Sequence, residues 1–188
     1  MSVYTIKTEL NQDMLDCPIQ SQPSEKCLVN AVTGQEIEIL YSNGPDRILE
    51  IATFFPAKGL EPPFHCHPFQ DEFYFVNEGS LTLKTKLGKK VYQKGQLIHI
   101  RKNQAHSIWN AGESHARANW RTFPALQTEA FLLTLWLLAD QGKTDSHGIP
   151  RNYLRIEILL RFASVYRSPK FKVIVGISWL QKYLRKLF

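Results

Sequence analysis

Four side chains with metal-binding donor atoms lie close together in residues 59–110. Residues two apart in an extended strand point to the same face, so His65 and His67 can direct both imidazoles at one point. Residues 68–71 turn the chain, and the carboxylate of Glu72 can return to that point at the start of the next strand. His106 begins a later strand and can supply a third imidazole. This pattern predicts a site for a divalent metal ion.

Three imidazoles and one carboxylate suit a divalent transition metal, and Fe, Mn, Ni, Zn, Co and Cu are all compatible with these donors. We expect Fe, Mn, Ni or Zn, and the sequence does not distinguish among them. An octahedral ion on four protein donors keeps open positions, where a substrate or oxygen could bind. The alternative is a scaffold that keeps these residues around an empty or purely structural site.

Other residues near this site have two interpretations each. Glu72 could be a general base instead of a metal ligand. Tyr74 shares the strand face of Glu72, so it could orient a substrate or donate a proton as a catalytic residue, or it could fill the interior of a barrel. Arg101 could pair with an anionic substrate or be solvated at the surface. Six aromatic residues could line an apolar cavity or pack the core and a subunit interface: Phe54, Phe55, Phe64, Phe73, Phe75 and Trp109.

The elements that must position these residues are short strands. Polar and apolar residues alternate in short runs from Val29 onward, and turn-forming residues separate the runs. Many short strands with frequent turns favour a sandwich or barrel. The segment Leu87 to Lys89 predicts a tight hairpin. The expected strands are residues 36–41, 48–55, 72–76, 80–87, 91–92, 96–100, 107–110 and 117–122.

After Pro124 the apolar spacing becomes helical. Thr128 is expected to cap a helix, Glu129 to lie in its first turn and Gly142 to end it. A second helix is expected at about residues 151–166. Residues 171–188 carry one apolar stripe and predict an amphipathic helix.

We therefore divide the chain into an N-terminal arm (residues 1–28), a β-barrel (29–123) and a helical, basic C-terminal extension (124–188). Residues 143–188 contain ten Lys or Arg and two acidic residues, so the positive charge belongs to the extension. The extension could pack on the barrel or on the partner in a homodimer, which we favour. It could instead lie on an anionic membrane surface as a peripheral contact. Nucleic acid is not expected as a partner, because no base-reading motif is present.

The cysteines and the first residues of the chain favour a reducing environment. The chain has three cysteines, an odd number, and their spacing matches no zinc or redox pattern. Residues 1–15 contain no apolar stretch typical of a signal peptide. The longest apolar run, residues 130–139, is about half of the roughly 20 residues that span a bilayer. We expect a cytoplasmic protein without a transmembrane helix.

The spacing in residues 59–79 resembles the first motif of the cupin superfamily, which is G-x5-H-x-H-x3,4-E-x6-G. All five motif positions are present: Gly59, His65, His67, Glu72 and Gly79. The three glycines Gly59, Gly79 and Gly95 fall at expected strand ends, where a turn often needs a positive φ.

Residues 95–110 resemble the second cupin motif, G-x5-P-x-G-x2-H-x3-N. Gly95, His106 and Asn110 match it, and Asn110 could hydrogen-bond across strands near the site. Arg101 replaces the usual proline, which loosens a turn and places a cation near the barrel mouth. Asn103 replaces the usual glycine, and asparagine tolerates the left-handed conformation better than most residues.

The resemblance covers about residues 29–122 and implies a mainly β fold, a double-sheet jelly-roll barrel of six to eight strands. It also implies that His65, His67, Glu72 and His106 are the metal ligands. We therefore expect a cupin-like metalloprotein that binds a small organic ligand beside the metal, with metal-dependent dioxygenation or isomerisation as the leading reaction classes. The alternative is a non-catalytic binding or assembly module whose basic tail docks a partner subunit or an anionic membrane, because cupin folds host many functions.

Overall fold

The computed structural model describes residues 27–168. The amphipathic helix expected at residues 171–188 lies outside the described residues, as do residues 1–26 of the predicted N-terminal arm. The boundaries of the three segments stay a prediction.

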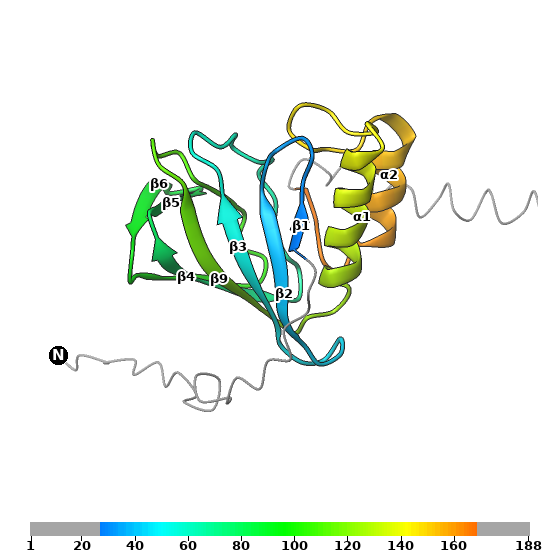
Figure 1. Ribbon diagram of the computed structural model, residues 1–188. Helices are drawn as coiled ribbons and strands as arrows, with labels where there is room; N and C mark the ends of the chain where they lie inside the picture. The colour runs from blue at the N-terminus through cyan, green and yellow to red at the C-terminus, as the bar shows by residue number, and fades with distance from the viewer. Residues whose placement is uncertain (1–26, 169–188) are drawn as a thin grey trace, which may run out of the picture.

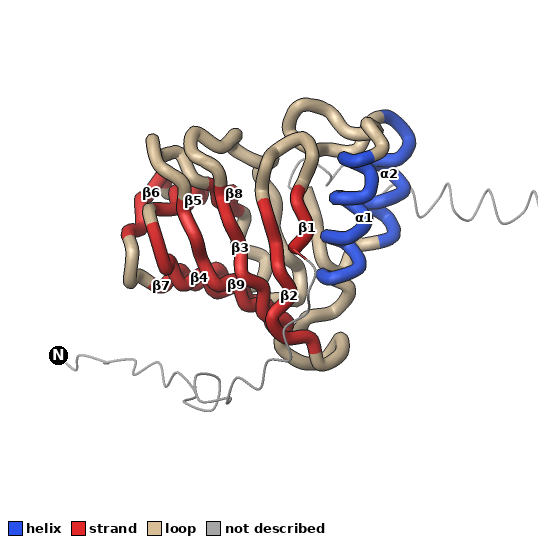
Figure 2. The backbone as a smooth tube through the Cα atoms, viewed as in Figure 1, coloured by secondary structure: helices blue, strands red, loops and turns tan. Residues whose placement is uncertain are grey.

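Two antiparallel sheets form the β part of the molecule (Figures 1 and 2). The larger sheet has the order β1 (Cys27–Val29), β2 (Glu36–Ser42), β3 (Leu49–Phe55), β9 (Ala116–Phe123), β4 (Asp71–Glu78) and β7 (Leu97–Ile100). The smaller sheet has the order β6 (Gly88–Gln93), β5 (Ser80–Thr85) and β8 (His106–Trp109). The predicted mainly β, double-sheet jelly-roll fold is confirmed, and β1 is a strand that the sequence did not indicate.

Side chains alternate across the sheets as the period of two requires. In β4, Glu72, Tyr74 and Val76 are buried between the sheets, whereas Phe75 faces outward and is 45% exposed. Glu72 and Tyr74 therefore share the inner face, as predicted.

The hairpin between β5 and β6 is shifted by one residue from its prediction. Thr85 pairs with Gly88, so the two turn residues are Lys86 and Leu87. Gly88 belongs to the strand and has a φ of 119°, a conformation that favours glycine.

Two helices follow the barrel. Helix α1 (Thr128–Asp140) has Glu129 in its first turn, and Gly142 follows its end with a φ of 65°. Both features were predicted. The predicted cap by Thr128 is wrong: Gln127 is the N-cap residue, and the Thr128 hydroxyl accepts a hydrogen bond from Gln70 instead.

Helix α2 (Asn152–Arg161) is shorter than the predicted helix, which extended to Tyr166. After Arg161 the chain turns at residues 162–165 and then pairs with the barrel through Arg167 and Cys66. Val165 N and Tyr166 N still donate to the Phe162 carbonyl, and backbone hydrogen bonds with the barrel begin at Arg167.

The helices pack on the side of the larger sheet where β1 and β2 lie (Figure 1). Leu132 and Trp136 of α1 join the core of the barrel, and the indole Nε1 of Trp136 donates to the Leu28 carbonyl. A second apolar cluster lies between the helices, with Phe131 and Phe162 among its members. Neither described helix is long and apolar enough to cross a bilayer.

Candidate metal centre

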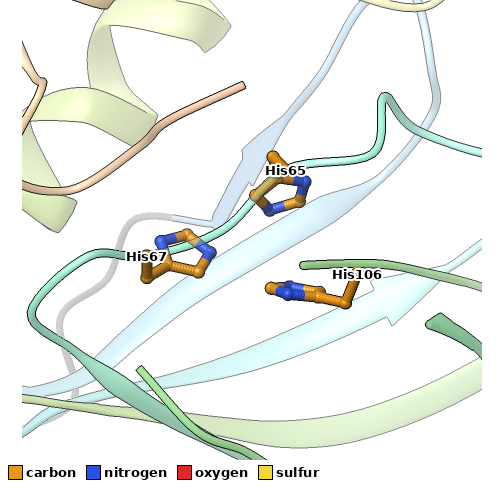
Figure 3. A group of neighbouring side chains, drawn as sticks. All are labelled: His65, His67 and His106. Atoms are coloured by element: carbon orange, nitrogen blue, oxygen red, sulfur yellow. The ribbon is translucent and has the colours of Figure 1, made fainter. Parts of the chain in front are cut away.

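Three histidines meet in the interior of the barrel. His65, His67 and His106 each offer a ring nitrogen, and these nitrogens all lie within 4.8 Å of one another. Figure 3 shows the three rings facing a common space, with His65 and His67 on one segment and His106 on another. His106 is fully buried, and His67 is 7% exposed.

The backbone sets the positions of these histidines directly. His65 and His106 form an isolated antiparallel bridge, with hydrogen bonds of 2.9 Å from His65 N to His106 O and 2.7 Å from His106 N to His65 O. Residues paired in this way project their side chains to the same side. The backbone N–H of Asn103 donates to the His67 carbonyl at 2.8 Å, which ties the two motifs together.

Each histidine has its Nδ1 atom next to a backbone carbonyl. The partners are Pro63 for His65 at 2.8 Å, Val165 for His67 at 2.5 Å and Gln104 for His106 at 2.9 Å. A carbonyl can only accept, so each Nδ1 must carry the proton. This arrangement leaves the lone pair on Nε2, the tautomer that metal-bound histidines adopt when a carbonyl orients them.

Glu72 is 1% exposed and lies against two of the imidazoles. Its Oε2 is 3.2 Å from Nε2 of His67 and 3.1 Å from Nε2 of His106. None of these three atoms has a hydrogen-bond partner among the described residues. Buried polar atoms without partners each cost about 1–3 kcal/mol. A divalent cation would satisfy them, so the donor set fits a metal ion.

The protonation states follow from burial and from the close contacts. Burial, together with the neighbouring imidazoles, holds the pKa of His65 well below its usual range, and burial also lowers the pKa of His67. Burial opposes the charge of Glu72, but contacts with His67 and His106 outweigh it and lower the Glu72 pKa to about 2. Burial likewise opposes the charge of His106, yet its contact with Glu72 raises its pKa.

Tyr74 lies beside Glu72 in the same interior. Its hydroxyl is 3.5 Å from Glu72 Oε1, and its ring stacks on Trp120 with centroids 5.5 Å apart. Burial raises the pKa of Tyr74 well above its usual value, and the negative charge of Glu72 adds to this effect. The phenol therefore keeps its proton and is a hydrogen-bond donor at the site.

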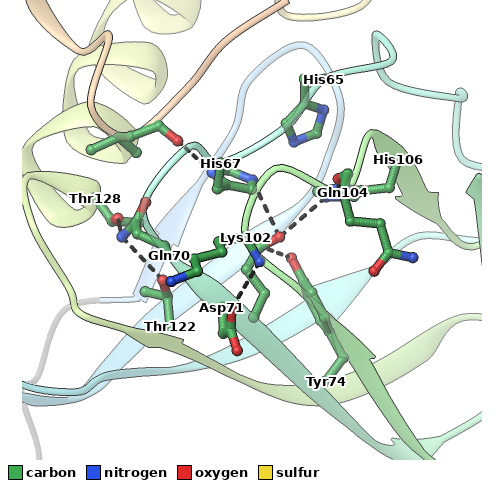
Figure 4. Close-up of polar contacts among 12 residues, drawn as sticks. His65, His67, Gln70, Asp71, Tyr74, Lys102, Gln104, His106, Thr122 and Thr128 are labelled. Atoms are coloured by element: carbon green, nitrogen blue, oxygen red, sulfur yellow. Dashed lines mark hydrogen bonds and ion pairs between the residues drawn. The ribbon is translucent and has the colours of Figure 1, made fainter.

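The turn before His106 keeps its shape without the proline of the motif. Gln104 N donates to the Arg101 carbonyl at 2.9 Å, and the Gln104 side chain accepts from Arg101 N at 3.1 Å. Asn103 has a φ of 61°, the left-handed conformation expected for this position. Asp71 accepts from Lys102 N at 2.7 Å (Figure 4). The Arg101 side chain is exposed.

The motif glycines serve different purposes. Gly79 and Gly95 have φ values of 67° and 84°, as predicted. The prediction for Gly59 is wrong, because its φ is not positive. A Cβ at Gly59 would lie 3.2 Å from the Asn110 carbonyl, so close backbone approach is the reason for this glycine. Asn110 Nδ2 lies 3.4 Å from the Phe55 carbonyl at the end of β3, the expected contact with a strand, and it also donates to the loop carbonyls of Pro56 and Ser114.

No sequence pattern indicated the contacts of the segment after α2, which touches three successive residues, His65, Cys66 and His67. Val165 accepts from His67 Nδ1, and the Tyr166 ring stacks on His65 with centroids 4.7 Å apart and an angle of 17°. Arg167 and Cys66 exchange two backbone hydrogen bonds of 2.9 Å. The two hydrogen bonds between Arg167 and Cys66 use only backbone groups, so the pattern of side chains in the sequence could not reveal them.

The remaining histidines and Cys66 lie outside the group of three. His99 is exposed and pairs with Asp71, and His115 pairs with Glu78. Cys66 is buried, and burial raises the pKa of its thiol. Cys66 lies between two residues of the site, and among the described residues it is not part of the group of metal-binding donors.

A cavity of about 230 Å³ adjoins the histidines. His65, His67, Glu72 and Tyr74 line it from the barrel, and residues of α1, α2 and the 147–150 loop line it as well. Two of the aromatic residues that the sequence offered for such a cavity, Phe55 and Trp109, are part of its wall.

Residues 53–120 match the family model described as "Cupin domain". Residues 53–120 of this chain therefore form a cupin domain. The match covers β4 to β8 and all three histidines. A search of the curated proteins found no match.

Several solved structures are similar to this chain in fold. The cupin domain of Cnp3 from Schizosaccharomyces pombe is 16% identical, with a TM-score of 0.43, over 47% of this chain and 60% of that chain. A sugar phosphate isomerase from Silicibacter pomeroyi is 20% identical, with a TM-score of 0.43, over 50% and 61%. The polyketide cyclase RemF from Streptomyces resistomycificus is 19% identical, with a TM-score of 0.45, over 52% and 72%. The chain thus spans about three fifths of the length of the Cnp3 domain and of the sugar phosphate isomerase.

Proposed function

We propose that this cupin is a metalloprotein that holds a divalent transition metal on His65, His67, His106 and Glu72. It binds a small organic molecule in the adjoining cavity. The observation that carries the proposal is the orientation of the imidazoles: a carbonyl holds each Nδ1, and Nε2 of His67 and of His106 lies beside the Glu72 carboxylate without a hydrogen bond.

The reaction classes that we propose are dioxygenation and isomerisation. When bound, such an ion polarises a substrate oxygen, and a redox-active ion also supports reactions with dioxygen. Within the chain, Glu72 remains ionised and compensates the charge of a cation. Tyr74 can donate a hydrogen bond to a ligand, and the aromatic wall of the cavity excludes water.

Metal analysis of protein purified without chelator tests the proposal. We expect about one equivalent of a transition metal in the natural protein and less than about a tenth in His106→Ala. The matched control is His115→Ala, which removes an exposed histidine that pairs with Glu78 outside the site. If the natural protein holds less than about a tenth of an equivalent and reconstitution does not restore it, the proposal is wrong.

A homodimer is a further part of this proposal, and light scattering would report twice the mass of the chain. The alternative role of the basic tail, which would dock a partner subunit or an anionic membrane, rests on residues 171–188. These lie outside the described residues, so that alternative stays a prediction.

A further inference from the structure

The cavity beside the histidines contains a positive charge that no described carboxylate neutralises. Two of its lining residues carry a formal charge, Glu72 and Arg155. Glu72 lies 3.2 Å from His67 and 3.1 Å from His106, so its charge is already engaged. Within residues 27–168, no carboxylate forms an ion pair with Arg155. The cavity therefore offers a free cation to a ligand.

Arg155 stands where the cavity meets solvent, because it lines the cavity and is also exposed. Ile158 and Leu159, one turn further along α2, line the cavity on the same helix face. Burial raises the pKa of Tyr166 to about 12, and the nearby charge of Arg155 acts in the opposite direction. Tyr166 also stacks on His65 with ring centroids 4.7 Å apart.

The rest of the cavity wall is largely apolar and aromatic. Helix α1 contributes one face, with residues three and four apart in the sequence: Phe131, Leu132, Leu135 and Trp136. The barrel contributes Phe55, Ile108, Trp109 and Trp120. Flat aromatic walls of this kind favour a flat apolar molecule, because stacked and edge contacts stabilise it beyond simple burial.

The size of the cavity excludes the smallest anions as well-fitting ligands. At about 30 Å³ per water molecule, 230 Å³ corresponds to roughly eight waters. A lone phosphate or acetate would leave most of the apolar wall in contact with water, whereas a molecule with one aromatic ring would cover it.

We propose that the cavity takes an aromatic or similarly flat apolar carboxylate, whose carboxylate pairs with Arg155 and whose body lies between α1 and the barrel. A guanidinium matches a carboxylate through two parallel hydrogen bonds, which gives this pairing its geometry. The inference rests on the proposed function, in which a metal ion lies beside the bound molecule. It adds the chemical class of that molecule.

Calorimetric titration with cinnamate, cinnamamide and acetate tests the inference, with metal-free and metal-reconstituted full-length protein. Cinnamate and cinnamamide share one apolar body and differ in charge. We expect cinnamate to bind about tenfold more tightly than cinnamamide. Acetate should bind most weakly, because it lacks the apolar body.

Two variants on the same helix locate the anion. Arg155→Gln should reduce the preference for cinnamate to within about twofold. Arg161→Gln removes the same charge from α2 at a position outside the cavity wall and should keep the preference. Arg155→Lys keeps the positive charge but loses the planar guanidinium that can form two parallel hydrogen bonds. This variant should keep part of the preference for cinnamate.

The inference is wrong if the natural protein does not prefer cinnamate, if the preference survives Arg155→Gln, or if both glutamine variants lose it equally. A protein that holds one equivalent of metal but shows no preference overturns the ligand class alone. A protein that takes up no metal but shows a preference that depends on Arg155 overturns the metal site alone.

Discussion

Two segments far apart in the chain hold the three histidines, and they do so by different means. Residues 59–110 supply every proposed ligand together with the bridge between His65 and His106. The segment after α2 supplies no proposed ligand, but its Val165 carbonyl holds His67 and its Tyr166 ring covers His65. One segment provides the donors, and the other orients two of them.

The difference shows that the centre extends beyond the cupin domain. The family match ends at residue 120, whereas these orienting contacts come from residues 165–167. Groups that orient metal-bound histidines typically affect metal affinity by about 10–100-fold. We therefore expect the C-terminal extension to matter for metal binding although it carries no motif.

Lowering the pH should produce the largest effect, and it acts on the motif segment. Contact with Glu72 raises the pKa of His106, so a proton that binds its Nε2 competes with a cation at a higher pH than at an ordinary histidine. Metal affinity should therefore fall as the pH falls, by up to about tenfold per pH unit for each proton displaced. Titrations with Zn²⁺ between about pH 8 and about pH 5 measure it. An affinity that stays constant over this range would contradict the assignment of the ligands.

Replacing Gln70 tests the link between the barrel and the C-terminal extension, which carries the orienting segment. Its Nε2 lies within 2.7–3.1 Å of four acceptors, which include the hydroxyls of Thr122 in β9 and Thr128 in α1 (Figure 4). Gln70→Leu leaves these buried acceptors without their donor and should lower the free energy of unfolding by about 2 kcal/mol. Denaturant titration measures it.

The control for this prediction is Gln93→Leu, an exposed position in β6, which should change stability by less than about 0.5 kcal/mol. Equal stabilities for the two variants would mean that Gln70 does not join the barrel to the extension.

A substitution at Arg167 tests the orienting segment itself. Arg167→Pro removes the backbone N–H that donates to the Cys66 carbonyl at 2.9 Å and should weaken metal binding by about tenfold. Arg167→Ala keeps that N–H and is the matched control. If both variants bind metal with the affinity of the natural protein, the segment does not orient the histidines for metal binding.

Restoring the glycine of the second motif should produce the smallest effect. Asn103 has a φ of 61°, a conformation that glycine adopts without strain. Asn103→Gly should raise the free energy of unfolding by no more than about 1 kcal/mol. Lys102→Gly, at a neighbouring position without a positive φ, should instead lower it. A loss of stability in Asn103→Gly would show that the asparagine contributes more than its conformation.

The sequence alone determined most of the strands, which depend on short-range patterns, and its two motifs indicated the donor residues. Alternation in β4 placed Glu72 and Tyr74 on one inner face, and the spacing of His65 and His67 placed two imidazoles together. The left-handed turn at Asn103 also followed from residue type. Predictions of local structure were wrong where a tertiary contact used the same group. The Thr128 hydroxyl, for example, accepts a hydrogen bond from Gln70 and does not cap α1.

Only the tertiary structure decided what surrounds the donors. The residues of α2 and of the segment after it are separated from His67 by about half the chain, and no periodicity encodes such a contact. A backbone carbonyl such as that of Val165 is present at every position, so nothing in its residue type marks it as a partner of an imidazole. Arg155 likewise was one of ten cations in a basic extension until the fold placed it in the cavity wall.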